Sequence, residues 1–112
     1  GQGKYMQLNN QAGNWCQDPS FGNLTGGAWQ FFGTRRKGGT NTGFLNGANI
    51  GNGCTGDTRD VSAGHAGPFE IGSTYGGGSP LNGSMSLSIV YKAAPSDADI
   101  ANLYKGLGSG SR

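Results

Sequence analysis

The sequence predicts an all-β fold, a small antiparallel β-sandwich with one short α-helix at its carboxy-terminal end. Two observations predict the sheets: apolar and polar residues alternate in several short segments, and 24 of the 112 residues are glycine, which suits a chain with many tight turns. A third, a capped amphipathic stretch after Pro95, predicts the helix. A chain of this length fits one domain with a modest core. We predict a single domain over residues 1–107, followed by a flexible tail over 108–112.

The composition favours an ordered chain over a disordered one. Charged residues make up 12% of the sequence and the net charge is only +2, whereas disorder usually combines low hydrophobicity with high net charge. Aromatic residues make up 10%, enough to contribute to a core. No apolar run approaches the roughly 18 residues that a membrane-spanning helix needs. We therefore expect no direct membrane insertion, so any membrane attachment would come from a partner or another part of the protein.

Three strands are predicted in the first third of the chain. Residues 4–8 alternate and contain strand-forming side chains, a brief strand is expected near Trp15, and residues 28–36 give the clearest strand pattern of this half. Within that last segment Trp29 is expected to lie in the core.

The middle of the chain carries the strongest turn signal. Residues 37–43 are rich in glycine and are predicted to form a turn. Asn46-Gly47 lies between apolar residues and is the dipeptide most typical of a two-residue β-hairpin. Residues 51–68 are expected to be mostly loop, with one candidate strand over 59–62.

The last part of the chain is predicted to contain two strands and the helix. Residues 69–75 form one strand, and residues 85–92 alternate so regularly that we expect a half-buried strand, with Met85, Leu87, Ile89 and Tyr91 on one face. Ser96 is positioned to cap a helix, with Asp99 three residues later as in a capping box.

The predicted helix has one apolar stripe and a glycine stop. Ile100, Leu103, Tyr104 and Leu107 follow the spacing of one helix face. Gly106 is expected to end the helix. About ten residues are too few to be stable alone in water, so this stripe must pack on a sheet.

Cys16 and Cys54 are the two cysteines of the chain. We predict a disulfide between them, which would stabilise the fold by about 3–4 kcal/mol in the chain-entropy model. The alternative is a pair of buried thiols in a reducing compartment. Zinc is not expected, because His65 is the single histidine and no CxxC motif occurs.

Two stretches resemble the concanavalin A-like, laminin-G-like jelly-roll domains. Residues 68–106, with "FEIGSTYGGGSPLNGSMSLSIVY" followed by "PSDADIANLY", are similar to the carboxy-terminal signature of that family. Residues 28–51, "AWQFFGTRRKGGTNTGFLNGANIG", are similar to its tryptophan strand and following hairpin. Together with residues 1–8 they cover about two-thirds of the chain. The family's domains are longer, so this chain would be a reduced sandwich or one completed by strands of another chain.

The resemblance implies a lectin-like module that often binds calcium. Asp57 and Asp60 lie in one loop and are the candidate calcium ligands, since calcium prefers loop oxygens; the alternative is a pair of turn aspartates neutralised by Arg59. Aromatic side chains that could stack on a sugar are Tyr75, Trp15 and Phe21.

Catalysis and nucleic-acid binding are not expected. Glycoside hydrolysis needs two carboxylates, and Glu70 is the only glutamate. His65 lies in a glycine-containing loop without a nucleophile motif. Residues 34–37, TRRK, are the single basic cluster, and they are more typical of a solvated turn or of charges that protect a sheet edge than of a phosphate-binding site.

The leading functional hypothesis is a non-enzymatic extracellular or virion surface module. It would be a structural or adhesive subunit of a pilus or phage fibre, with other subunits as partners and glycans as candidate ligands. The alternative hypothesis is a free-standing soluble carbohydrate-binding lectin.

Overall fold

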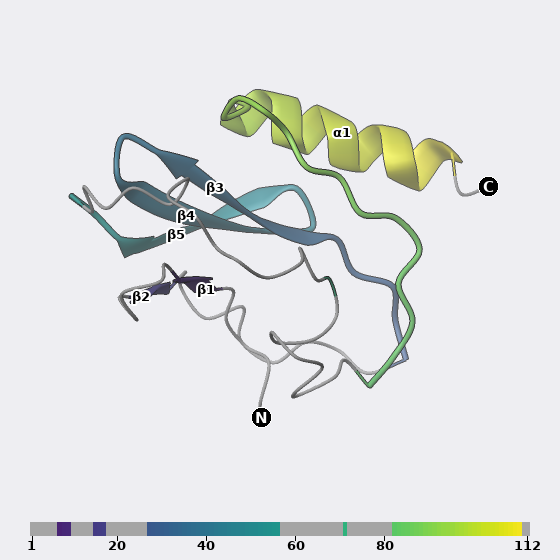
Figure 1. Cartoon of the computed structure of the whole chain (residues 1–112). Helices are drawn as coiled ribbons and strands as arrows, with labels where there is room; N and C mark the ends of the chain where they lie inside the picture. Colours follow the sequence, from purple (N-terminus) through teal and green to yellow (C-terminus); the bar gives the residue numbers. More distant parts are fainter. Residues whose placement is uncertain (1–6, 10–14, 18–26, 57–70, 72–81, 111–112) are drawn as a thin grey trace.

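The computed structural model describes residues 7–9, 15–17, 27–56, 71 and 82–110, of which 7–9, 15–17 and 108–110 are described as backbone alone. The elements in chain order are β1 (Gln7–Asn9), β2 (Trp15–Gln17), β3 (Phe32–Lys37), β4 (Thr40–Leu45), β5 (Ala48–Cys54) and α1 (Asp97–Gly110). They form three layers, with α1 on one face of a sheet of β3, β4 and β5, and the β1–β2 pair on the other (Figure 1).

Two tight hairpins build the three-stranded antiparallel sheet. Gly38 and Gly39 connect β3 to β4, and Asn46 and Gly47 connect β4 to β5. All four residues have positive φ, at 57°, 78°, 51° and 81°, which is the backbone of a type I′ turn. Asn46 also extends the β3–β4 ladder, because its N–H donates to Phe31 O and its side-chain Oδ1 accepts from Phe31 N at 3.0 Å. The hairpin predicted at Asn46-Gly47 is confirmed.

The central strand β4 supplies most of the buried residues. Phe44 is 1% exposed, and Asn41 and Thr42 are buried beside it. The Thr42 hydroxyl donates to Asn52 Oδ1 at 2.8 Å, whereas neither amide atom of Asn41 has a hydrogen-bond partner. Among the described residues only Phe44 and Ile100 are buried hydrophobics, so the helix is a large part of the core.

The helix begins with a complete capping box. Asp99 N donates to Ser96 Oγ at 3.0 Å, and Ser96 N donates to Asp99 Oδ2 at 3.1 Å, which satisfies two backbone donors reciprocally. The predicted cap is therefore confirmed. The predicted end at Gly106 is wrong, since α1 continues to Gly110 and includes residues 108–110 of the predicted tail. Gly106 and Gly108 both lie inside α1, although a glycine in a helix interior costs about 1 kcal/mol relative to alanine.

The apolar stripe of α1 lies on the sheet as predicted. Ile100 is 8% exposed, and the ring of Tyr104 lies 6.0 Å from that of Phe31. Tyr104 also lies directly on the β4–β5 turn, because a Cβ added to Gly47 would be 2.9 Å from Tyr104 Cβ. The helix therefore packs across the β4–β5 hairpin.

The strand predicted over residues 28–36 starts later than expected. β3 begins at Phe32, and Trp29 is 72% exposed, so its placement in the core is wrong. The reason is the position of the Asn46-Gly47 turn, which fixes the last residue of β4 and so ends the ladder near Phe31. Residues 37–43 are not one turn either, since β4 starts at Thr40.

The strand predicted over residues 85–92 is absent from the structure. These residues run from the described loop at 82–83 to the start of α1 without helix or strand (Figure 1). Alternation fits a strand, but a strand also needs a pairing partner, and none of the described strands supplies one.

The fold class is thus confirmed in its coarser part, an antiparallel sheet with one carboxy-terminal helix. The brief strand near Trp15 is also confirmed, and residues 7–8 of the predicted first strand lie in β1. The candidate strand over 59–62 lies outside the described residues, as does the strand over 69–75 apart from Ile71.

Candidate interaction surface

The most unusual feature of the described structure is an unpaired segment over residues 84–91, whose sequence alternates as that of a strand does. Every residue of this segment is exposed. None of its backbone N–H or C=O groups has a hydrogen-bond partner within the described structure. A row of open backbone groups on strand-forming residues is a template for pairing with another chain.

Five of the eight residues of this segment are apolar or aromatic, and the other three are serines. Its odd-numbered residues are about half exposed, with Met85 at 47%, Leu87 at 56% and Ile89 at 43%, and Val90 on the opposite side is 74% exposed. The odd-numbered apolar side chains are thus partly covered by the protein, and Val90 is more exposed than they are.

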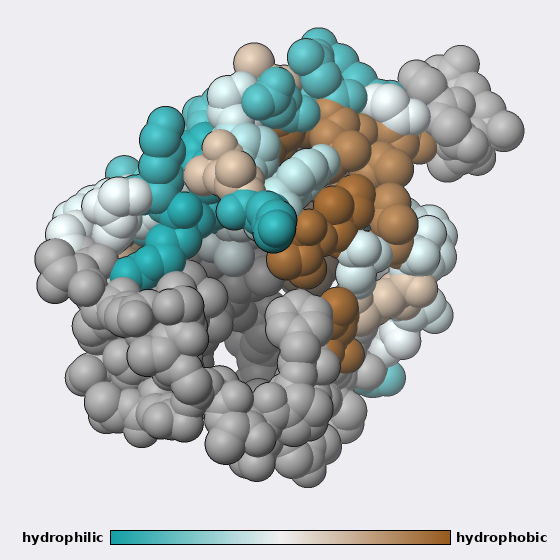
Figure 2. All heavy atoms as spheres, turned by 45° about the horizontal axis from the view of Figure 1, so that its top comes forward, coloured by the Kyte–Doolittle hydropathy of each residue, from teal (hydrophilic) through white to brown (hydrophobic). Residues whose placement is uncertain are grey.

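Further hydrophobic side chains of the described chain are exposed. Figure 2 shows hydrophobic residues gathered on one side of the molecule beside the helix. Outside the segment itself, the large exposed hydrophobics of the described chain include Trp29 and Tyr104. A contiguous apolar surface on a small protein marks an interaction site more often than a solvated face.

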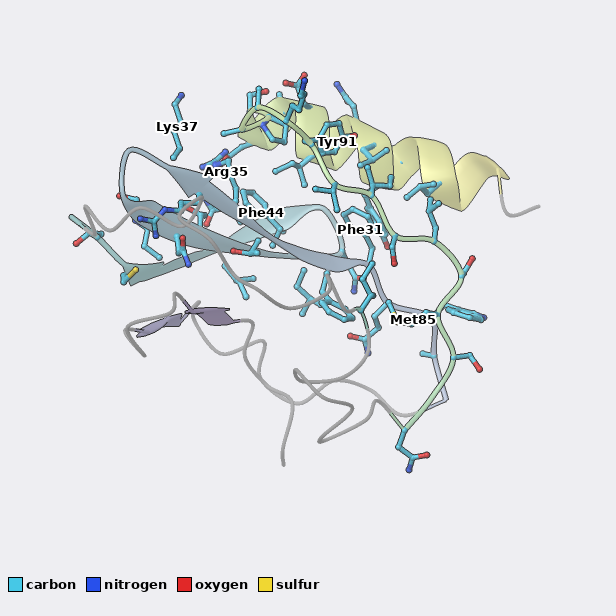
Figure 3. All side chains as sticks on the ribbon, viewed as in Figure 1. Phe31, Arg35, Lys37, Phe44, Met85 and Tyr91 are labelled. Atoms are coloured by element: carbon cyan, nitrogen blue, oxygen red, sulfur yellow. The ribbon has the colours of Figure 1, made fainter. Side chains whose placement is uncertain are left out.

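A polar cluster attaches the start of α1, which follows the segment in the chain, to the sheet. Arg35 on β3 donates from Nη1 to Pro95 O at 3.1 Å and to Asp97 Oδ1 at 2.5 Å, and Asn49 on β5 donates from Nδ2 to Asp97 Oδ2 at 3.0 Å. The Arg35 guanidinium lies 5.0 Å above the ring centre of Phe44, between the sheet and α1 (Figure 3). These four groups hold the first turn of the helix against two strands.

The electrostatics of the helix start follow from these contacts. The hydrogen bond from Asn49, followed by that from Arg35, lowers the pKa of Asp97 below its ordinary value of 3.8. The hydrogen bonds from Ser96, backbone first, lower the pKa of Asp99 in the same way. Both carboxylates also lie in the first turn, where the helix dipole favours negative charge.

The basic cluster predicted as a solvated turn is partly structural. Arg35 is only 16% exposed in its side chain and pairs with Asp97. The two residues are far apart in the sequence, so no local pattern signalled this contact. The apolar segment, by contrast, could be recognised in the sequence, because residues 82–91 contain no charged residue. The sequence did not show that the segment lacks a partner strand.

The described residues do not test the predicted ligand-binding residues. Tyr75, Phe21, Asp57 and Asp60 lie outside the described residues, and Trp15 lies on β2, which is described as backbone alone. Glycan and calcium binding therefore stay predictions.

Two further sequence candidates, His65 and Glu70, also lie outside the described residues. Within the part of the chain that is described, no group of three or more His, Cys, Asp or Glu side chains could hold a metal ion. No described helix is long and apolar enough to span a membrane.

Of the two cysteines of the predicted disulfide, Cys54 alone is described with its side chain. Cys54 closes β5 and is not a free thiol, and β2, which carries Cys16, lies close to β5. The pairing of Cys16 with Cys54 stays a prediction that this proximity makes feasible.

Comparison with known proteins gives a fold neighbour. No protein-family model matches the chain, and no curated protein matches it. Among solved structures, the chain is similar to a fragment of an S-layer domain-containing protein from Clostridium thermocellum, with a TM-score of 0.52 and 23% identity. The match covers 89% of this chain and 49% of that fragment, so the chain spans about half the neighbour's length. At this identity the likeness concerns the fold alone.

Proposed function

We propose that this chain is a non-enzymatic structural module of a cell-surface protein, and that it assembles with other protein subunits through the apolar surface around residues 84–91. The observation that carries the proposal is the exposed segment itself, which combines apolar side chains with open backbone groups. In a soluble protein such a segment invites uncontrolled pairing unless a partner covers it.

Two further observations support the proposal. The fold neighbour is an S-layer domain-containing protein, a class whose name denotes a surface layer, and the low charge and high glycine content suit an exported β-protein. An extracellular location and a role without catalysis are parts of the proposal, as is completion of a jelly-roll sandwich by strands beyond the described ones.

The proposal is tested by locating the protein and its assemblies on intact cells. Antibodies against the chain should label the surface of unbroken cells, and the protein should sediment with large assemblies after gentle lysis. Labelling that requires permeabilised cells would contradict the surface location.

A pair of lysine variants tests the role of the segment in assembly. Val90→Lys places a charge on a side chain that is 74% exposed, so the fold should tolerate it while pairing is weakened. Asn102→Lys adds the same charge on an exposed position of α1 and is the matched control. We expect the first variant to be lost from the assemblies and the second to remain; equal recovery of both would contradict the proposed surface.

A further inference from the structure

We propose that the partner of residues 84–91 is the same segment of a second copy of this chain, paired antiparallel around a two-fold axis at Ser88. This inference rests on the proposed function and names the partner that the apolar surface would meet. A two-fold contact uses the same residues of both copies, which is the commonest symmetry of homo-oligomers.

The alternation of the segment is compatible with pairing to itself. In an antiparallel pair centred on Ser88, Leu87 lies opposite Ile89 and Met85 lies opposite Tyr91. Apolar side chains thus meet apolar side chains, and opposite residues share one face of the new sheet, which is the arrangement in which cross-strand pairs stabilise. A centre moved by half a residue, between two neighbours, would place odd-numbered residues opposite even-numbered ones and lose this match.

The charges also permit self-pairing. Residues 82–91 carry none, so no like charges face each other within the paired region. The nearest charge is Lys92, which would lie opposite Ser84 of the second copy. The two lysines would then lie about eight residues apart along the strands, roughly 27 Å at the usual rise, well beyond the screening distance of about 8 Å at physiological salt.

Open backbone groups leave the segment free to form the hydrogen bonds of a strand pair. Residues 84–91 make no backbone hydrogen bond within the described structure, so pairing would not have to break one. Two short strands bury little area, and small interfaces are weak on their own. We therefore expect a dimer that forms only at high protein concentration in solution. It should become stable when many copies are held together on a surface, where the effective concentration is high.

Single cysteine substitutions test the register directly. Ser88→Cys would place two thiols opposite each other across the axis, within disulfide reach. Ser86→Cys is the matched control, because its two copies would lie about four residues apart, roughly 14 Å, too far to bridge. Under mild oxidation at high protein concentration, we expect a covalent dimer for Ser88→Cys and none for Ser86→Cys or the unaltered chain. Equal cross-linking of the two variants would overturn the register.

A charge exchange at the same position tests the partner. Ser88→Lys should weaken self-association by up to about fivefold, because two like charges would face each other, and Ser88→Glu should do the same. An equimolar mixture of the two variants should associate again, since opposite charges would then meet. Association by another strand or surface predicts no such recovery, and its absence would overturn the inference.

Sedimentation separates the failure of this inference from that of the proposed function. A chain that stays monomeric at every concentration, or a dimer that is indifferent to Ser88→Lys, would refute self-pairing. In either case labelling of intact cells still decides the surface role by itself. If self-pairing held but the chain were found only inside cells, the inference would stand and the proposed location would fail.

Discussion

Replacing Gly47 by alanine should destabilise the protein through two separable effects. The first is conformational, because φ at Gly47 is +81° and a residue with a Cβ pays about 1–2 kcal/mol in the left-handed region. The second is steric, because the new Cβ would lie 2.9 Å from both Cβ and Cδ1 of Tyr104. Forcing atoms into a packed contact costs typically about 1–3 kcal/mol. Together these terms predict a loss of about 2–5 kcal/mol in the free energy of unfolding.

Gly38→Ala is the matched control for this variant. Gly38 also has positive φ, at +57°, but nothing lies within 4 Å of its added Cβ, so only the conformational cost applies. Urea denaturation followed by circular dichroism measures both variants. Gly47→Ala should cost clearly more than Gly38→Ala. The excess should shrink in a Tyr104→Ala background, which removes the ring atoms Cγ and Cδ1 from the contact but keeps Cβ. Equal costs in the unaltered background would refute the packing of α1 on the β4–β5 turn.

Three other predictions follow from the same contacts. Ile100→Ala should lower the free energy of unfolding by about 2–5 kcal/mol in a urea titration, because it empties one of the two buried hydrophobic positions of the described core; an effect below 1 kcal/mol would show that the helix contributes little. The lowered pKa values of Asp97 and Asp99 stabilise the fold above their ordinary value of 3.8, and this contribution is lost as pH falls through the folded-state pKa values. In thermal unfolding between pH 6 and pH 2, the Asp97→Asn variant should lose less stability on acidification than the unaltered chain. The same pH profile for both would contradict a stabilising role of the Asp97 carboxylate. Cys54→Ser, or reduction of the unaltered chain, should cost about 3–4 kcal/mol if Cys16 is its partner, and a reductant that changes nothing would argue against the disulfide.

The features that could be predicted from the sequence are those whose causes are local. The Asn46-Gly47 hairpin depends on two residues that accept positive φ, and the helix start depends on the reciprocal bonds of Ser96 and Asp99. The hairpin turn and the helix cap each involve about four consecutive residues. The local sequence pattern is therefore enough to predict them.

The features that were mispredicted depend on residues distant in the sequence. Trp29 is exposed because the turn at Asn46 decides where the β3–β4 ladder ends. Residues 85–92 have the pattern of a strand but lack a partner among the described strands, and Arg35 reaches an aspartate 62 residues further along the chain. Periodicity describes which side chains can share a face, but it does not say which other segment will face them. Of the predicted site residues, the structure leaves the ligand-binding ones untested.

Hydrogen exchange at the backbone amides of residues 84–91 tests the central claim most directly. In dilute solution, where we expect a monomer, these amides should exchange at nearly the rate of an unfolded peptide, while those of β4 stay protected. On assembly at high concentration the segment should gain protection and β4 should change little. Protection of residues 84–91 in the dilute monomer would show that they are already paired within the chain, and would contradict the role assigned to them.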